Sequence, residues 1–408
     1  MRRGEGEQSH EQAPAPSPSG RPGSRPYELV LLFNAMFGGL TAVGLPLALN
    51  SAGLSKAAIA VFFVSNAFVA VFYNTVLVPR IRRAGYPRLA LIGTLCCVPV
   101  GTLLVARSAD QPEVLYTGGV LMLCVSAVVP QIFGRAGTAL GGEITTTMVL
   151  RFRRVLIAGY IAGLLLYSVC VALHLDPLLV AALVASLCLT GPVSSVFRGK
   201  VAPSPRALGE ATRSPLRRPP ALVVCAALVV VALLKSVDTL RGLYLPLVAA
   251  SGGIEPSLIS ASFMVGSLLE FAMLPILGML MRRQGSALAS VVVASVSITV
   301  FVLMASSTGI WALFIVQALY SFVGAGFQSV GLLLLSDVRG SDAGAGASAY
   351  MAVTQVGTVL GALLPLVVPG YSPAIFWLAA AMSFGAAALG WVVHSRSGAS
   401  RSVFGSVS

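Results

Sequence analysis

Long apolar runs constrain this chain more than any other feature. A helix needs about 20 apolar residues to cross the hydrocarbon core of a bilayer, and backbone groups in lipid find partners only within helices or closed barrels. Such runs lie at 28–50, 56–78, 89–107, 114–134, 148–172, 176–197, 221–250, 257–281, 287–307, 310–335, 344–368 and 373–394. The sequence therefore predicts an all-α membrane protein with twelve transmembrane helices.

The composition also indicates lipid as the solvent. Hydrophobic residues make up 56% of the chain and charged residues 10%, whereas a soluble domain has about 25% charged residues. The 6 cysteines all fall in apolar runs without metal-ligand spacing, and the 3 histidines lie far apart. We therefore expect no metal, no cofactor and no disulfide.

The polar segments predict the domain organisation. Residues 1–27 are rich in Pro, Ser, Gly and charge, which is typical of a disordered segment and not of a signal peptide. The Pro-, Ser- and Arg-rich segment 198–220 reads as a flexible basic connector between two six-helix bundles. We place these bundles at 28–197 and 221–394, followed by a tail at 395–408.

The basic residues predict the orientation. An even number of spans puts both termini on one side, and 23 of the 27 basic residues fall on that side. The exceptions are Lys56 and Arg107 in outer loops, and Lys235 and Arg241 within a span. Cytoplasmic loops of membrane proteins carry such an excess, so we expect both termini to be cytoplasmic. The net charge of +13 then reflects topology and not nucleic-acid binding.

We expect a monomer in the lipid bilayer of the cytoplasmic (inner) membrane.

The two halves repeat each other. A shift of 200 residues places LPLALNSAGL (45–54) on LPLVAASGGI (245–254) without a gap. Later spans fit with small changes of offset, one of which aligns Gly159 with Gly361. The repeat predicts two pseudo-symmetric bundles with the same orientation.

Two like-oriented six-helix halves joined by a long inner loop resemble the major facilitator superfamily of secondary transporters. Within that superfamily the chain is most similar to the bacterial sugar-efflux (Set-type) transporters. The matching features are VPQIFG near the inner end of the fourth span, Arg153 ten residues before Gly163, Asp238 followed by LPL ending at Leu247, LLEFAMLP in the eighth span, and the RRQG loop after it. The resemblance implies that the two bundles rock about a central site.

The resemblance also implies where gates lie. Basic pairs follow the second and the eighth spans, at Arg82, Arg83, Arg282 and Arg283. The acidic residue of the family's pattern is absent from both loops. Pro46 and Pro246, at matching places of the repeat, are expected to kink their helices and shape an outer gate. The alternative is that each proline marks only a helix end inherited through the repeat.

Four charged residues lie in predicted spans away from the span ends: Lys235, Asp238, Arg241 and Glu270. A charge at the centre of a spanning helix costs roughly 2.5–3.5 kcal/mol on insertion scales, so these side chains must pair or face water. Asp238 is three residues from both Lys235 and Arg241 and can pair with either. Glu270, near the middle of its span, either balances the remaining positive charge or faces a cavity alone.

These charges are candidates for proton coupling and substrate binding. A buried carboxylate is pushed toward its neutral form, while a nearby cation pulls it back toward the charged form. Glu270 is therefore the first candidate for proton exchange, and Asp238, flanked by cations, is the second and is expected to organise the site. Arg153, Lys235 and Arg241 are expected to bind substrate oxygens. The alternatives are structural ion pairs and, for Arg153, an arginine that reaches toward the membrane surface.

Neutral polar residues within the spans extend the candidate site. Amides that both donate and accept hydrogen bonds suit a hydroxyl-rich ligand, and they also cross-link helices. The candidates are Asn66, Gln131, Gln328 and Gln355. Tyr244 either stacks on a sugar ring or anchors its helix at the interface.

The sequence thus predicts proton-coupled export of a small polar solute, such as a sugar or glycoside, by alternating access. Two alternatives stay open. One is a multidrug or secondary-metabolite efflux transporter, and the other is a non-transporting membrane sensor or scaffold. No nucleophile–base arrangement is readable, so we do not expect an enzyme. The predicted partners are a small-molecule substrate and protons.

Overall fold

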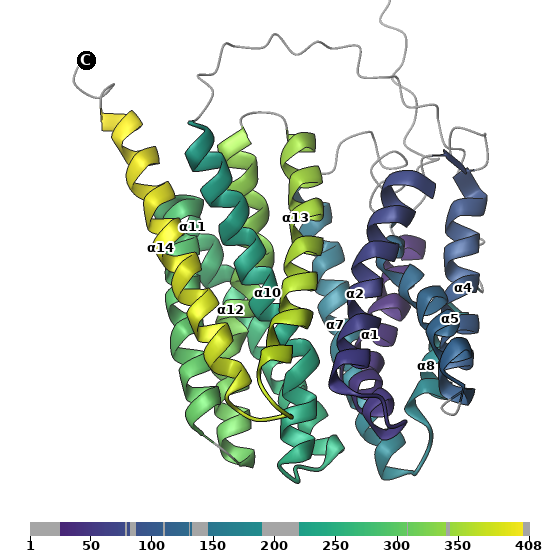
Figure 1. Ribbon diagram of the computed structural model, residues 1–408. Helices are drawn as coiled ribbons and strands as arrows, with labels where there is room; N and C mark the ends of the chain where they lie inside the picture. Colours follow the sequence, from purple (N-terminus) through teal and green to yellow (C-terminus); the bar gives the residue numbers. More distant parts are fainter. Residues whose placement is uncertain are drawn as a thin grey trace, which may run out of the picture.

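The computed structural model describes residues 25–77, 80–81, 87–108, 111–129, 131–132, 146–189, 220–307, 309–339 and 343–402. The described parts are helices that run side by side in one general direction (Figure 1). We call residues 25–189 the N-terminal half and residues 220–402 the C-terminal half. The predicted disordered segment up to residue 24 and the connector 198–219 lie outside the described residues.

The N-terminal half contains helices that start close to the predicted apolar runs. They are α1 (Arg25–Ser51), α2 (Lys56–Phe72), α4 (Pro87–Arg107), α5 (Pro112–Met122), α7 (Thr146–Ala172) and α8 (Pro177–Leu187). A π-helical turn η1 (Tyr73–Leu77) extends α2, and a 3-10 turn η2 (Leu123–Ala127) extends α5. Side-chain caps fix two of the starts, because Ser55 and Asp176 accept hydrogen bonds from the first turns of α2 and α8.

The C-terminal half contains longer helices. They are α10 (Ala221–Ser251), α11 (Pro256–Ser306), α12 (Ile310–Arg339), α13 (Ala343–Leu363) with the 3-10 turn η3 (Leu364–Val367), and α14 (Ile375–Ser402). Six of the described helices are long and apolar enough to cross a membrane: Arg25–Ser51, Arg151–Ala172, Ala221–Ser251, Pro256–Ser306, Ile310–Val338 and Ile375–Arg396. The chain is therefore a multi-pass membrane protein, while the total of twelve crossings stays a prediction.

Helix α11 has 51 residues but is not one straight helix. At 1.5 Å per residue it would be about 77 Å long, more than twice the thickness of the hydrocarbon core. Gly285 interrupts it with φ 81 and ψ 167, a conformation open to a residue without a Cβ atom. Ile254, just before α11, and Met304, near its end, line the same pocket. The chain therefore reverses at Gly285, and the two arms correspond to the predicted spans 257–281 and 287–307.

The backbone reproduces the sequence repeat at the turns after α1 and α10. Gly53 and Gly253 have φ values of 77 and 81. The N–H of Leu54 donates to the carbonyl of Leu49 at 3.2 Å, and that of Ile254 donates to the carbonyl of Ala249 at 3.1 Å. Both helices thus end in the same left-handed glycine turn, at positions 200 residues apart.

Matched glycines bring two helix pairs into close backbone contact. A Cβ atom at Gly163 of α7 would lie 2.1 Å from the carbonyl oxygen of Met36 on α1. One at Gly361 of α13 would lie 2.3 Å from the carbonyl oxygen of Ser236 on α10. Small residues permit such close approach of membrane helices. Because Met36 and Ser236 are 200 residues apart, the two contacts are equivalent.

A second glycine on each helix corrects the predicted register. A Cβ atom at Gly159 would lie 2.5 Å from the carbonyl oxygen of Leu32, and one at Gly357 would lie 2.6 Å from that of Ala232. The equivalent of Gly159 is therefore Gly357, and its predicted alignment with Gly361 is wrong by four residues. Glycines four apart on both helices allow two sequence registers, and only the packing distinguishes them.

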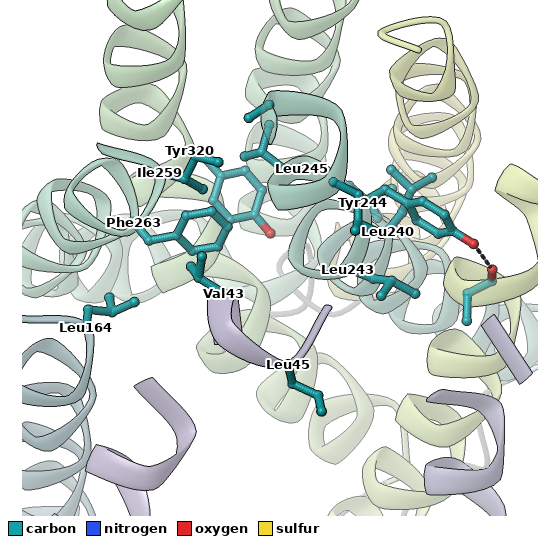
Figure 2. Close-up of a cluster of buried hydrophobic side chains, with 14 of the residues drawn as sticks. Val43, Leu45, Leu164, Leu240, Leu243, Tyr244, Leu245, Ile259, Phe263 and Tyr320 are labelled. Carbon is teal, nitrogen blue, oxygen red and sulfur yellow. Dashed lines mark hydrogen bonds between the residues drawn. The ribbon is translucent and has the colours of Figure 1, made fainter. Parts of the chain in front are cut away.

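The two halves contact each other along α7–α11, α2–α13 and α1–α10. Buried side chains from both halves meet in one apolar cluster, where Val43 and Leu164 lie near Phe263 (Figure 2). Apolar packing thus joins the halves, and the polar contacts described below add to it. The predicted bundle boundaries and the two-bundle layout stay predictions.

Candidate functional site

The predicted charge pair on α10 forms between Lys235 and Asp238. Lys235 Nζ lies 2.8 Å from Asp238 Oδ2, and Tyr320 of α12 donates its hydroxyl to Asp238 Oδ1 at 2.9 Å. Both carboxylate oxygens therefore have a partner. The two charged side chains are 25% and 26% exposed, so the pair is only partly covered.

Arg241, the other possible partner of Asp238, is held by neutral groups. Its Nε donates to Gln317 Oε1 at 3.1 Å, and its Nη2 donates to the same oxygen. The guanidinium carbon lies 3.8 Å from the centre of the Tyr320 ring and 4.6 Å from that of Phe263, where cation–π attraction stabilises it. Among the described residues no carboxylate forms an ion pair with Arg241.

Glu270 pairs with an arginine of the other half. Glu270 Oε1 on α11 lies 3.7 Å from Arg153 Nη2 on α7, and the side chains are 20% and 19% exposed. This separation is too long for a hydrogen bond, and Nε and Nη2 of Arg153 are buried without a hydrogen-bond partner among the described residues. The pair therefore joins the halves while leaving donors unused.

These residues lie close enough to interact as one electrostatic group. Glu270 interacts with the charges of Asp238 and Arg241 as well as with Arg153. Tyr160 of α7 and Tyr350 of α13 interact with charges of the same set. We call the set the central charge group; its members are Arg153, Lys235, Asp238, Arg241 and Glu270.

Two other predicted substrate residues, Gln131 and Tyr244, form hydrogen bonds to groups outside the central charge group. Gln131 Nε2 donates to Thr94 Oγ1 at 3.2 Å, and Thr94 Oγ1 also hydrogen-bonds to the hydroxyl of Tyr73 at 2.6 Å. Tyr244 is 0% exposed and donates to the carbonyl oxygen of Ala362 at 2.6 Å. Tyr244 thus packs against α13, and its assignment to substrate contact or to interface anchoring stays a prediction.

The remaining candidates are placed only by their helices. Gln355 is half-buried on α13. Asn66 lies on α2 and Gln328 on α12, and their side chains are outside the described residues. Their assignment to substrate contact stays a prediction.

The predicted gating residues differ in exposure, and two of them are not described by the structure. Arg282 and Arg283 are exposed just before the Gly285 turn, while Arg82 and Arg83 lie outside the described residues. Pro46 and Pro246 are buried inside α1 and α10, and each helix continues beyond its proline. Neither proline is a helix end, which removes the alternative that they mark only inherited helix ends.

Lys56 makes a contact that the sequence did not predict. Its ammonium group donates to the carbonyl oxygens of Pro365, Val368 and Gly370, each at 2.7 Å. An ammonium group has three donors, and all three are used on the opposite half. We call this contact the Lys56 clasp. The sequence did contain a signal for this contact. Lys56 lies in a predicted outer loop, whereas most basic residues lie on the predicted inner side.

Hydroxyl groups join the halves where α7 meets α11, away from the Lys56 clasp. Ser260 of α11 donates to the carbonyl oxygen of Leu164 on α7 at 2.8 Å, and Ser168 donates to that of Ser257 at 3.4 Å. These contacts and the Lys56 clasp lie toward the end of the molecule that carries the Gly53 and Gly253 turns. We call it the Gly53 end, which is the predicted outer side.

Solved structures of the same architecture are membrane proteins. A nucleoside transporter, NupG, matches with a TM-score of 0.69 and 15% identity over 91% of this chain and 98% of its own. The chain has the fold of a membrane transporter. An auto-inhibited peptide transporter of the POT family shares this transporter fold with a TM-score of 0.65 and 13% identity, covering 91% of this chain and 96% of its own.

A bacterial homologue of the human lysosomal transporter Spinster, solved in an inward-facing and unoccupied conformation, also has this transporter fold. Its TM-score is 0.61 and its identity 10%, over 91% of this chain and 96% of its own. No family model and no curated protein matches the sequence. At these identities the likeness concerns the fold, so the sugar-efflux subfamily stays a prediction.

Proposed function

We propose that the chain is a secondary active transporter that moves a small polar solute by alternating access, coupled to protons through Glu270. The observation that carries the proposal is the Arg153–Glu270 pair. It joins the two halves among partly buried charges, where movement of one half against the other must change it. The transporter fold supports the same conclusion.

The central charge group suggests how the coupling works. A proton on Glu270 removes the negative charge that holds Arg153, and the halves then lose one electrostatic contact between them. Release of the proton restores the contact. Asp238 already has Lys235 and Tyr320 on its two oxygens, so we assign it the positioning of the site and Glu270 the proton exchange.

The outer side closes through the Lys56 clasp and the serine contacts of α7 and α11. In this proposal these contacts break when the site opens outward. Each is a side-chain hydrogen bond to backbone, so it separates without unfolding a helix. The resemblance to sugar-efflux transporters favours export, with a sugar or glycoside as the solute.

The test is uptake into everted membrane vesicles with an imposed pH gradient, over a panel of sugars, glycosides and antibiotics. We expect proton-linked uptake of a polar solute that Glu270→Gln abolishes. Glu28→Gln is the matched control, because Glu28 also pairs with an arginine of α7 but does so within one half. Unchanged proton coupling in Glu270→Gln would exclude Glu270 from the mechanism.

The same experiment separates the alternatives. Uptake of chemically diverse antibiotics without sugar uptake favours a multidrug or secondary-metabolite efflux transporter. No turnover of any solute in proteoliposomes, together with no effect of neutralising the central charge group, favours a sensor or scaffold.

A further inference from the structure

The central charge group has one positive charge in excess. Lys235 is paired with Asp238, and Arg153 with Glu270. Arg241 contacts the neutral Gln317 and two aromatic rings, and within the described part of the chain it has no carboxylate partner. The excess charge therefore belongs to Arg241.

The same place has unused hydrogen-bond donors. Gln317 is 0% exposed, and its Nε2 has no hydrogen-bond partner in the described ranges of the chain. Within the same ranges, Nε and Nη2 of Arg153 are also buried without one. Buried polar groups in folded proteins are nearly always satisfied, so each exception needs an explanation, and a bound ligand is one. A ligand that satisfied all these donors would have to be an acceptor.

Acceptors, in contrast, are mostly occupied. Both oxygens of Asp238 are hydrogen-bonded, and the oxygen of Gln317 accepts twice from Arg241. Glu270 lies 3.7 Å from Arg153, too far for a hydrogen bond, so its carboxylate is the acceptor left open in this group. A solute that mainly donates hydrogen bonds would find Glu270, whereas one that accepts would find donors on Arg153, Arg241 and Gln317.

We propose that the transported solute is an oxyanion, a small polar molecule whose carboxylate or phosphate group binds at Arg241, Gln317 and Arg153. This inference rests on the proposed transport function and narrows its substrate class. The guanidinium group of arginine matches carboxylate and phosphate with parallel, charge-assisted hydrogen bonds. A single negative charge also cancels the excess charge of the group.

The test measures equilibrium binding to the purified, lipid-reconstituted protein with four probes that share one ring. The probes are glucose, glucuronate, glucose 6-phosphate and glucosamine. We expect an oxyanion to bind at least about 10-fold more tightly than glucose, because its ion pair with Arg241 is a charge-assisted contact. Glucosamine adds a positive charge instead and should bind most weakly. The comparison of glucuronate with glucose 6-phosphate identifies the carboxylate or the phosphate as the preferred group.

Variants test the residue assignment. Arg241→Gln should weaken oxyanion binding about 10- to 100-fold with little change for glucose. Arg241→Lys, which keeps the charge, should recover part of the loss. Arg151→Gln is the control, because this more exposed arginine pairs with Glu28. Retained glucose binding and an unchanged gel-filtration profile establish that Arg241→Gln is folded.

The outcomes separate this inference from the proposed function. Oxyanion preference without uptake in proteoliposomes upholds the oxyanion-binding site but contradicts transport. Uptake of glucose without oxyanion preference upholds transport and overturns the inference. Failure of both oxyanions to bind, tighter binding of glucosamine, or an unchanged preference in Arg241→Gln also overturns it.

Discussion

Arg151 and Arg153 of α7 each pair with a glutamate, but only Arg153 reaches the other half. Arg151 Nε lies 2.7 Å from Glu28 within the N-terminal half, and its side chain is 56% exposed. Arg153 lies 3.7 Å from Glu270 across the two halves, and its side chain is 19% exposed. The shorter pair is the more exposed one, and exposed ion pairs contribute little to stability. The longer pair is less exposed and incompletely satisfied, so it can be exchanged for another partner.

The same distinction holds for contacts that carry no charge pair. Within each half, Gly163 and Gly361 bring backbones together so closely that a Cβ atom would overlap a carbonyl oxygen. Between the halves, the Lys56 clasp and the serine hydroxyls use side chains that can release a carbonyl. We therefore expect contacts within a half to set stability and contacts between halves to set transport.

The largest expected effect is on transport. Arg153→Gln should lower the initial rate of solute uptake in proteoliposomes by about 100-fold, because it removes charge-assisted interactions in a partly buried site. Arg151→Gln, two residues away, should change the rate by less than about 2-fold. Equal losses in the two variants would contradict the distinction drawn here.

The next effect is on stability. Gly163→Ala and Gly361→Ala should each lower the free energy of unfolding by about 1–3 kcal/mol, since the added methyl group overpacks a helix contact. Thermal unfolding in detergent measures it. Gly242→Ala is the control, because a Cβ atom at Gly242 of α10 would have no atom of the described residues within 4 Å. A much larger loss at one glycine than at its counterpart would contradict the equivalence of the two helix pairs.

A smaller effect is expected at the Gly53 end. Lys56→Met removes three hydrogen bonds between the halves and should shift the population toward an open outer side by about 10-fold. Spin labels at Leu175 and Trp311, both exposed, report the distance across this end in a variant without native cysteines. Lys56→Arg keeps N–H donors and should shift the population less. An unchanged distance distribution in Lys56→Met would remove the clasp from the gate.

The smallest effect is expected for the exposed pair. Glu28→Gln should change the free energy of unfolding by less than about 1 kcal/mol, because Arg151 is largely hydrated. The difference should shrink further in 1 M salt, which screens exposed charges. Thermal unfolding at low and high salt measures both. A loss of several kcal/mol would show that this pair, too, has a structural role that its exposure conceals.

Much of the helical framework was predictable from hydropathy. The runs at 28–50, 221–250 and 373–394 correspond to α1, α10 and α14, because length and apolar content suffice to predict a spanning helix. The pair of Lys235 and Asp238 followed from their spacing of three residues on one helix. These features depend only on residues close together in the sequence.

Contacts between distant helices were not predictable in this way. Spacing within one helix gives no information about Arg153 and Glu270, which come from opposite halves. Gln317 and Tyr320 were also missed, although two polar residues three apart in an apolar run were a visible signal. The sequence interpretation chose Gln328 of the same helix instead, because nothing local distinguishes which face of α12 meets α10.

The Lys56 clasp has a consequence for the symmetry of the molecule. The residue 200 positions after Lys56 is Pro256, which has no ammonium group, and its flank is closed by serine hydroxyls. Rotation about a pseudo-twofold axis would therefore exchange the flank held by the Lys56 ammonium group with the flank held by uncharged serine hydroxyls. Duplicated halves can share a backbone and still separate unevenly, with one edge parting before the other.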